Sequence, residues 1–305
     1  MKIGLAMNPV SGGVDAYEKR FMAAGAAAVL NAPIIGLDTT SADDFKECIT
    51  EAKKRLDCLV GIGGDGIMSD IINAGPNDNC ILGYLAYLGS GRALGWGLGY
   101  NMENTPPTAE KLTKAALRIL HGENHSIDAI LCETPSCSSK ALMAGVGIEA
   151  DVITRTELLR KAGMSSLRAY VVGSVVSVFG GYQRDTLSIE ADDQHDVLND
   201  MIKFLVMKHP YFGYGLRVNP HAELDSGKLH GLALSGGIPM IAKSLATSVM
   251  NGNIFGGNTQ GIPYTADRIK LTSTNPLPLH VDGTSLDVST EFEFTVLPKE
   301  LTFRY

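Results

Sequence analysis

The sequence feature that most constrains the fold is a glycine-rich turn, Gly61-Ile62-Gly63-Gly64-Asp65-Gly66. Residues 57–60 before it form a short apolar run of the kind that makes a buried parallel strand. After it, Ile67, Asp70 and Ile71 fall at helical spacing. A strand, a glycine turn and a helix aim backbone N–H groups and the positive end of a helix dipole at an anion. This order predicts a phosphate-binding turn, and the alternative is a plain strand-to-helix turn with its aspartate as helix N-cap.

The segments around this turn alternate between strand and helix patterns. Alternation at this spacing indicates a doubly wound, Rossmann-like parallel sheet, whose ligands bind where the carboxyl ends of the strands gather. The expected strands are 3–7, 32–37, 57–60 and 79–88, and the expected helices are 14–30, 39–56 and 109–121.

The pattern changes after residues 121–124, a polar segment with a glycine that we interpret as a domain boundary. Beyond it the sequence has short alternating segments and few helical patterns, which is typical of antiparallel sheets. A chain of 305 residues is long enough for two compact domains. The strands expected in the second one are 127–133, 139–146, 185–191, 202–208, 228–235, 268–273 and 292–297.

Composition limits the classes of function. With 45% hydrophobic and 19% charged residues, the chain can bury a substantial core. A net charge of −7 without a basic stripe argues against nucleic-acid binding. The five cysteines lack the spacing of a zinc site, since Cys132 and Cys137 have no second pair, so reduced thiols in a cytosolic protein are expected. Residues 1–7 are too short for a signal peptide, and residues 170–182 are too short for a membrane span.

Two motifs carry a resemblance to a known family. Gly63-Gly64-Asp65-Gly66, followed by Asp70, resembles the nucleotide loop of the diacylglycerol kinase and sphingosine kinase superfamily, and NAD kinases share its core. Asn8-Pro9-Val10-Ser11-Gly12, after the first strand, resembles the second hallmark of this superfamily. NAD kinases generally lack the second motif, so the pair together favours the lipid kinases.

Four later segments match the superfamily in order along the chain. Residues 89–92 correspond to a loop on the nucleotide, with Arg92 where the family has Asn. Arg92 would meet a phosphate or would be a surface charge, and both alternatives remain open. Residues 144–152 and 279–284 match two segments near the lipid, and residues 219–229 match one that holds a structural magnesium in bacterial diacylglycerol kinases.

The resemblance also implies an arrangement of domains. Residues 1–124 would form the nucleotide-binding domain, and residues 125–291 would form a β-sandwich that holds the lipid substrate. The last strand, at about residues 292–305, would return to the first domain, with the active site in the cleft between the two. ATP would be the phosphate donor, and Mg²⁺ would arrive with it.

The resemblance carries over to particular residues. Asp65 or Asp282 would orient and deprotonate the acceptor hydroxyl, Asp151 and Thr284 would lie at the lipid, and Asp225 would lie at the structural magnesium. The residues implied at the nucleotide are Asn8, Pro9, Ser11, Gly12, Thr39, Thr40, Gly63, Gly64, Asp65, Gly66, Ile67, Asp70, Ser90, Gly91 and Arg92.

Four positions depart from the superfamily pattern, namely Ile67, Arg92, Ser226 and Thr284. Ser226 replaces the second aspartate of the magnesium segment, and hard Mg²⁺ prefers carboxylate oxygens. Thr284 replaces a glutamate, and a threonine hydroxyl is not a general base near neutral pH.

We therefore expect an ATP-dependent kinase that phosphorylates a hydroxyl of a diacylglycerol-like or sphingoid-like lipid. It would be cytoplasmic and would reach its lipid at a membrane surface, and the sequence leaves peripheral attachment and a homodimer open. An NAD kinase and a non-catalytic nucleotide- or lipid-binding homologue are the alternatives. The order of the motifs favours the kinase, whereas the four departures favour the binding protein.

Overall fold

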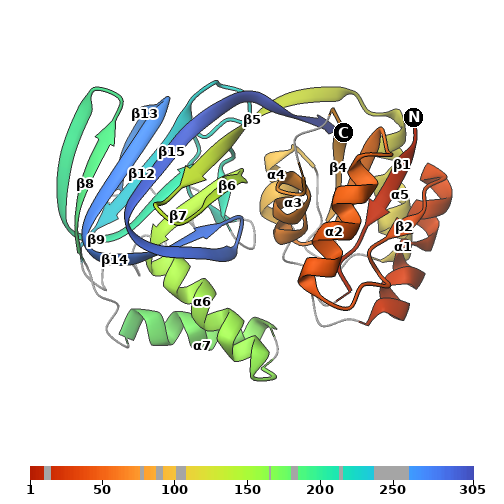
Figure 1. Cartoon of the computed structure of the whole chain (residues 1–305), viewed down its shortest axis with the longest axis horizontal. Coiled ribbons are helices and arrows are strands. Elements are labelled where there is room, and N and C mark those ends of the chain that lie inside the picture. Colours follow the sequence, from red (N-terminus) through yellow and green to blue (C-terminus); the bar gives the residue numbers. More distant parts are fainter. Residues whose placement is uncertain are drawn as a thin grey trace. The chain divides into compact units, whose positions relative to one another are not determined.

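The computed structural model describes residues 1–9, 15–75, 79–86, 92–100, 108–164, 166–179, 185–212, 216–236 and 261–305. They divide into two compact units. Unit 1 contains Met1–Ile127 and Lys299–Tyr305, and unit 2 contains Asp128–Phe212 and Leu216–Pro298. Two long strands, labelled β5 and β15 in Figure 1, continue from one unit into the other.

Unit 1 is built on a parallel sheet. Its strand order is β2-β1-β3-β4-β15, and every neighbouring pair is parallel. The end of β15 joins this sheet through Phe303, which pairs with Leu82. The strands are β1 (Ile3–Ala6), β2 (Ile34–Ile35), β3 (Cys58–Gly63), β4 (Ile81–Ala86) and β15 (Thr284–Arg304).

The helices of unit 1 begin where the sequence supplies capping side chains. Asp15, Ser41 and Thr108 each accept a hydrogen bond from the backbone N–H three residues later, at the starts of α1, α2 and α5. This bond satisfies one of the N–H groups that a helix start leaves without an intrahelical partner. The helices are α1 (Ala16–Leu30), α2 (Ala42–Lys53), α3 (Asp65–Ile72), α4 (Arg92–Gly97) and α5 (Ala109–His121).

Helices cover both faces of this sheet. Val60 and Ile62 of β3 belong to a core cluster that includes residues of α1 and α5. A Cβ atom at Gly61 would lie 2.7 Å from Met68 and 2.9 Å from Ile71, both in α3. Since alternate residues of a strand face opposite sides, α1 and α5 cover one face and α3 covers the other.

Unit 2 is built from antiparallel strand pairs. β7 and β8 each pair with both β9 and β14, so these four strands form a closed cycle of pairings. Buried side chains such as Phe204, Leu279 and Phe292 form one core cluster within the unit. The strands are β5 (Asn124–Glu133), β6 (Ser138–Ala141), β7 (Met143–Gly147), β8 (Asp185–Ala191), β9 (Gln194–Met207), β10 (Tyr211–Phe212), β11 (Leu216–Arg217), β12 (Leu229–Ser235), β13 (Gly261–Ala266), β14 (Arg268–Val281) and most of β15.

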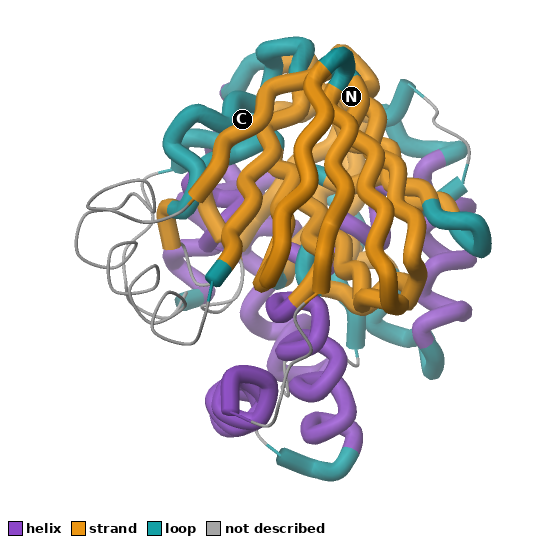
Figure 2. Tube along the Cα trace, turned by 90° about the vertical axis from the view of Figure 1, so that its left-hand side faces the viewer, coloured by secondary structure: helices purple, strands orange, loops and turns teal. Residues whose placement is uncertain are grey.

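A helical pair, α6 (Ile148–Lys161) and α7 (Ser166–Phe179), follows β7 and lies at one end of the strands of unit 2 (Figures 1 and 2). The two helices approach closely at Gly173, where a Cβ atom would lie 2.9 Å from Thr156 Oγ1. Val172, Val175 and Val176 of α7 are exposed. In the described ranges, no helix has both the length and the apolar character that crossing a bilayer requires.

The expected elements differ from the observed ones mainly in length. The helix expected at 109–121 and the strand expected at 185–191 are α5 and β8, with those bounds. The segment 139–146, expected as one strand, contains two, β6 and β7. β14 extends well beyond the expected 268–273, because Pro276 and Pro278 hide its strand pattern and coincide with a shift in its register to β15. β13 was not predicted.

Candidate active site

The candidate site of unit 1 lies where the parallel strands end together. In the sheet register, Ala6 is opposite Gly61, and Gly63 is opposite Ala86. The chain therefore leaves β1, β3 and β4 at the same edge, which is where open parallel sheets bind ligands. Asn8 follows β1 at this edge, and Gly64 follows β3.

The glycine-rich turn is shorter than the sequence suggested. β3 continues through Gly63, α3 begins at Asp65, and only Gly64 lies between them. A Cβ atom at Gly63 would lie 3.1 Å from Cγ2 of Ile67, so this glycine permits α3 to pack closely on β3. The side chain of Ile67, a residue predicted at the nucleotide, is buried in this contact.

Asp65 occupies the first position of α3, and Gly64 is the N-cap, so the alternative that made Asp65 the cap is wrong. Its Oδ1 atom accepts a hydrogen bond of 3.1 Å from the backbone N–H of Leu94 in α4. The Tyr84 hydroxyl lies within hydrogen-bonding reach of the Asp65 carboxyl group and 3.2 Å from the carbonyl oxygen of Gly63. The residue as a whole is partly exposed, but protein atoms surround its carboxyl group.

The environment of Asp65 changes its acidity. Burial of the carboxyl group raises its pKa to about 7, and the hydrogen bonds from Leu94 and Tyr84 offset only part of this effect. A carboxyl group with a pKa near 7 can accept a proton and release it again at neutral pH. Such perturbed groups are frequent at functional sites.

Asn8 and Asp70, both predicted at the nucleotide, lie together. Burial raises the pKa of Asp70, and the positive charge of Lys46 and a hydrogen bond with the Asn8 side chain act in the opposite direction. This contact joins the loop after β1 to α3. Two motifs that are far apart in the sequence therefore meet at one place in unit 1.

Lys19 is a buried residue of this region that the sequence analysis missed. Its ammonium group donates hydrogen bonds of 2.8 Å to the backbone carbonyls of Asn8 and Pro9. Burial lowers the pKa of Lys19, and the nearby charge of Asp15 partly restores it. The signal was present in the sequence, since Lys19 shares the buried stripe of α1 with Ala23 and other apolar residues.

The remaining nucleotide residues fall into two groups. Thr39 donates its hydroxyl hydrogen to the carbonyl of Gly36, and Thr40 donates its own to Asp44. Both therefore take part in the loop between β2 and α2, which leaves the sheet at the same edge. Ser11, Gly12, Ser90 and Gly91 lie outside the described residues, as does the side chain of Arg92, which is the first residue of α4.

In unit 2, Asp282 has a structural role that the sequence analysis did not foresee. Asp282 and Gly283 form the two-residue turn between β14 and β15, with φ of 45° and 81°. Positive φ at both positions is typical of tight hairpin turns with an Asp-Gly sequence. The Asp282 carboxylate accepts hydrogen bonds from the backbone N–H groups of Leu142 (3.1 Å) and Met143 (2.9 Å).

The two residues expected at the lipid lie on neighbouring elements. Asp151 is in the first turn of α6 and accepts a hydrogen bond of 2.7 Å from Arg155. Thr284 is exposed and begins β15. The next residue, Ser285, lies 3.0 Å from Thr154 of α6 (Oγ to Oγ1), so the helix and the strand are in contact.

The residues around Asp225 do not fit the structural magnesium that the resemblance implies. Asp225 is exposed, and Ser226 supplies a hydroxyl where the family has a second carboxylate. Asp128, a buried carboxylate that contacts the same loop at Gly227, is already bound to Lys208. Within the part of the chain that the structure describes, no group of three or more histidine, cysteine or acidic side chains is placed to hold a metal.

Comparisons with known proteins agree with this fold. Residues 2–132 match the family model described as the diacylglycerol kinase catalytic domain. Among curated proteins, none matches the chain in sequence.

Among solved structures, the chain is similar to two from Bacillus anthracis str. Sterne. One is provisionally assigned as a diacylglycerol kinase (TM-score 0.73, 17% identity, 100% of this chain and 96% of that one). The other is described as a diacylglycerol kinase (TM-score 0.64, 16% identity, covering 100% of this chain and 96% of that one). At such identities the likeness is one of fold. An NAD kinase from Archaeoglobus fulgidus in complex with ATP is more distant (TM-score 0.49, 13% identity, covering 100% of this chain and 94% of that one).

The resemblance found from the motifs at Asn8 and Gly63 is confirmed: residues 2–132 match the diacylglycerol kinase catalytic domain, and the chain has a mixed α/β fold similar to the bacterial proteins described as diacylglycerol kinases.

Proposed function

We propose that this protein is an ATP-dependent kinase that transfers a phosphoryl group to a hydroxyl of a lipid of the diacylglycerol-like or sphingoid-like kind. The observation that carries the proposal is the position of the Asp65 carboxyl group, in the first turn of α3 at the edge where β1 and β3 end, with the Leu94 N–H on its Oδ1 atom. Its raised pKa, about 7, suits a general base. The family match over residues 2–132 supports the class of reaction. ATP, with the Mg²⁺ that accompanies it, is the proposed phosphate donor.

In this proposal the nucleotide phosphates bind at the edge where β1 and β3 end. The first N–H groups of α3 and the positive end of its dipole face that edge, which suits an anion. Asn8 and Asp70, joined by their hydrogen bond, fix the loop after β1 beside the helix. Lys19 donates hydrogen bonds to two backbone carbonyls of that loop, and these bonds keep the loop in place for the ligand.

Asp65 is the proposed general base. The acceptor hydroxyl gives its proton to the Asp65 carboxylate as its oxygen attacks the γ-phosphorus, and the bond from that phosphorus to the bridging oxygen of ADP breaks. General-base assistance contributes about 10²–10⁴-fold, and positioning and charge neutralisation supply most of the remaining acceleration. Asp282 is assigned a structural role instead, because its carboxylate ties the turn between β14 and β15 to the backbone N–H groups of Leu142 and Met143.

The exposed valines of α7 favour a lipid over a soluble acceptor. Val172, Val175 and Val176 are 39%, 51% and 41% exposed, and their spacing places them on one face of the helix. Arg168, also exposed, lies one turn before Val172, where it suits an anionic lipid headgroup. We propose that this face contacts the membrane from which the substrate is taken.

A phosphate-transfer assay tests the proposal. The protein is incubated with radiolabelled ATP and Mg²⁺, once with a mixed lipid extract, once with NAD and once with neither. Mass analysis then identifies the species that gains phosphate. We expect a lipid carrying a free hydroxyl to be labelled.

The two alternative functions predict other outcomes. Label in NADP and in no lipid identifies an NAD kinase. ATP binding in calorimetry without transfer to any acceptor identifies a non-catalytic binding protein. Either result would remove the lipid-kinase proposal.

A further inference from the structure

Unit 2 contains a buried ion pair that the proposed reaction does not use. Lys208, directly after β9, and Asp128, in β5, have side chains that are 0% and 1% exposed. The Lys208 ammonium nitrogen lies 2.8 Å from Oδ2 of Asp128. Isolating two such charges from water costs several kcal/mol each, so their surroundings must supply good hydrogen bonds.

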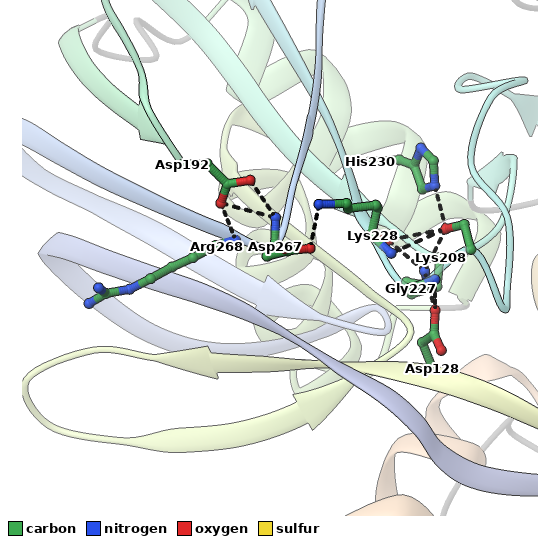
Figure 3. A network of polar contacts seen from close by, with 9 residues as sticks. Asp128, Asp192, Lys208, Gly227, Lys228, His230, Asp267 and Arg268 are labelled. Atoms are coloured by element: carbon green, nitrogen blue, oxygen red, sulfur yellow. Dashed lines mark hydrogen bonds and ion pairs between the residues drawn. The ribbon is translucent and has the colours of Figure 1, made fainter.

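The loop at residues 224–228 supplies these bonds (Figure 3). The Lys208 ammonium group donates to the backbone carbonyl of Lys228 at 2.6 Å and to Oγ of Ser226 at 3.2 Å. With Asp128 as the third acceptor, its three N–H groups are matched by three oxygen atoms. Oδ2 of Asp128 also accepts a hydrogen bond of 2.7 Å from the backbone N–H of Gly227, so both members of the ion pair are bound to the loop.

This set of oxygens is chemically similar to a cation site. A carboxylate, a backbone carbonyl and a hydroxyl converge on one positive charge, and these are the ligand types that Ca²⁺ and Mg²⁺ take. The distances of 2.6–3.2 Å are those of hydrogen bonds to an ammonium group, longer than the roughly 2.0–2.6 Å of bonds to those metals. The segment is also the one in which the resemblance implied magnesium.

We propose that the Lys208 ammonium group is a built-in replacement for a divalent cation, so that the 224–228 loop holds its conformation without metal. Ser226 fits this arrangement, because a hydroxyl can accept a hydrogen bond from an ammonium group without adding a second buried negative charge. His230 completes the arrangement, since its Nε2 lies 2.9 Å from the same hydroxyl oxygen. The inference does not depend on the proposed kinase activity.

The first test measures metal dependence on the wild-type protein without nucleotide. Thermal unfolding is followed in EDTA, in millimolar Mg²⁺ and in millimolar Ca²⁺. We expect the same Tm in all three, because a cation that does not bind the folded state cannot stabilise it. A saturable rise in Tm that either Asp225→Asn or Ser226→Ala removes would overturn the proposal. A rise that persists in both variants belongs to another site and agrees with the proposal.

The second test compares two lysines of the same network. Lys208→Met keeps the length of the side chain but leaves Asp128 buried without its cation, so Tm should fall by on the order of 10 °C. Lys228→Met is the matched control, since its ammonium group makes an exposed pair with Asp267 at 2.7 Å. Its Tm should change by no more than about 2 °C.

The comparison is decisive in both directions. Equal, small losses of Tm in Lys208→Met and Lys228→Met would show that the buried ammonium group does not hold the loop. If Lys208→Met does not fold at all, its loss of stability exceeds that of Lys228→Met, which agrees with the proposal. The metal titration of the wild type can then still refute the proposal.

Discussion

Replacing Asp65 with asparagine should make the protein more stable at alkaline pH. The unfolded aspartate releases its proton near pH 3.8, whereas the folded one keeps its proton up to about pH 7. The folded state therefore binds more protons between these values, and its free energy of unfolding falls as the pH rises through them. Asparagine has no proton to lose, so the variant escapes this destabilisation.

The magnitude follows from the pKa. Each pKa unit is worth ~1.4 kcal/mol, so a rise from 3.8 to about 7 corresponds to roughly 4 kcal/mol as an upper limit. Partial exposure of the residue screens some of this cost, and the dipole of α3 favours the charged form by up to about 1 kcal/mol. We therefore expect Asp65→Asn to be about 1–3 kcal/mol more stable than wild type at pH 8 and nearly equal to it at pH 4.

Urea unfolding across this pH range, without nucleotide, measures the effect. The stability difference between Asp65→Asn and wild type should grow with pH and become constant above about pH 7. Asp38→Asn is the control, because Asp38 is exposed and its ion pair with Arg20 is exposed too; its difference from wild type should remain small throughout. A difference for Asp65→Asn that does not vary with pH would refute the reasoning, and with it the assignment of Asp65 as a base poised near neutral pH.

Three further substitutions test other parts of the account. Gly64→Val should abolish ATP binding in calorimetry yet leave the fold intact, since Gly64 has an extended backbone (φ −82°) that valine can adopt; unchanged affinity would contradict the phosphate site. Asp282→Ala should lower the free energy of unfolding in urea by about 2–4 kcal/mol, whereas Asp282→Asn, which keeps an acceptor oxygen and tolerates positive φ, should cost less than half as much; equal losses would contradict the structural role. If Arg92 meets a phosphate, Arg92→Ala should weaken the binding of ATP by about 1.5–3 kcal/mol in calorimetry and the binding of adenosine much less. Equal small effects on the two ligands would make Arg92 a surface charge.

The sequence predicted the place of the glycine-rich turn better than its shape. Residues before and after the glycines had clear strand and helix patterns, and β3 and α3 are where these patterns indicated. The glycines themselves looked like a loop, because Gly61 and Gly63 carry no side chain to show the alternation of a strand. Their close packing against Ile67 and Met68 depends on three-dimensional contacts that no local pattern reveals.

The role of Asp282 was available from local chemistry. An Asp-Gly pair between two alternating segments is a strong signal for a two-residue hairpin, and β14 and β15 meet there. The resemblance drew attention to the carboxylate and away from the turn. The hydrogen bonds that Asp282 accepts from Leu142 and Met143 could not be predicted from the sequence, because those residues are far away along the chain.

Buried lysines were the least predictable feature. Lys19 could have been noticed on the apolar stripe of α1, but its acceptors are backbone carbonyls, which every residue has. Lys208 directly follows a strand, and its partner Asp128 belongs to another strand far away in the sequence. Pairing of this kind is decided by the topology of the sheet.

The initial rate of phosphate transfer from ATP to lipid, compared among wild type, Asp65→Asn and Asp282→Asn, tests the central claim most directly. With Asp65 as general base, Asp65→Asn should lose about 10²–10⁴-fold in rate at saturating ATP. Asp282→Asn should remain within about 10-fold of wild type, because its carboxylate serves the hairpin and not the proton transfer. The account would be contradicted if wild type transferred no phosphate to any lipid, or if Asp282→Asn lost activity while Asp65→Asn kept it.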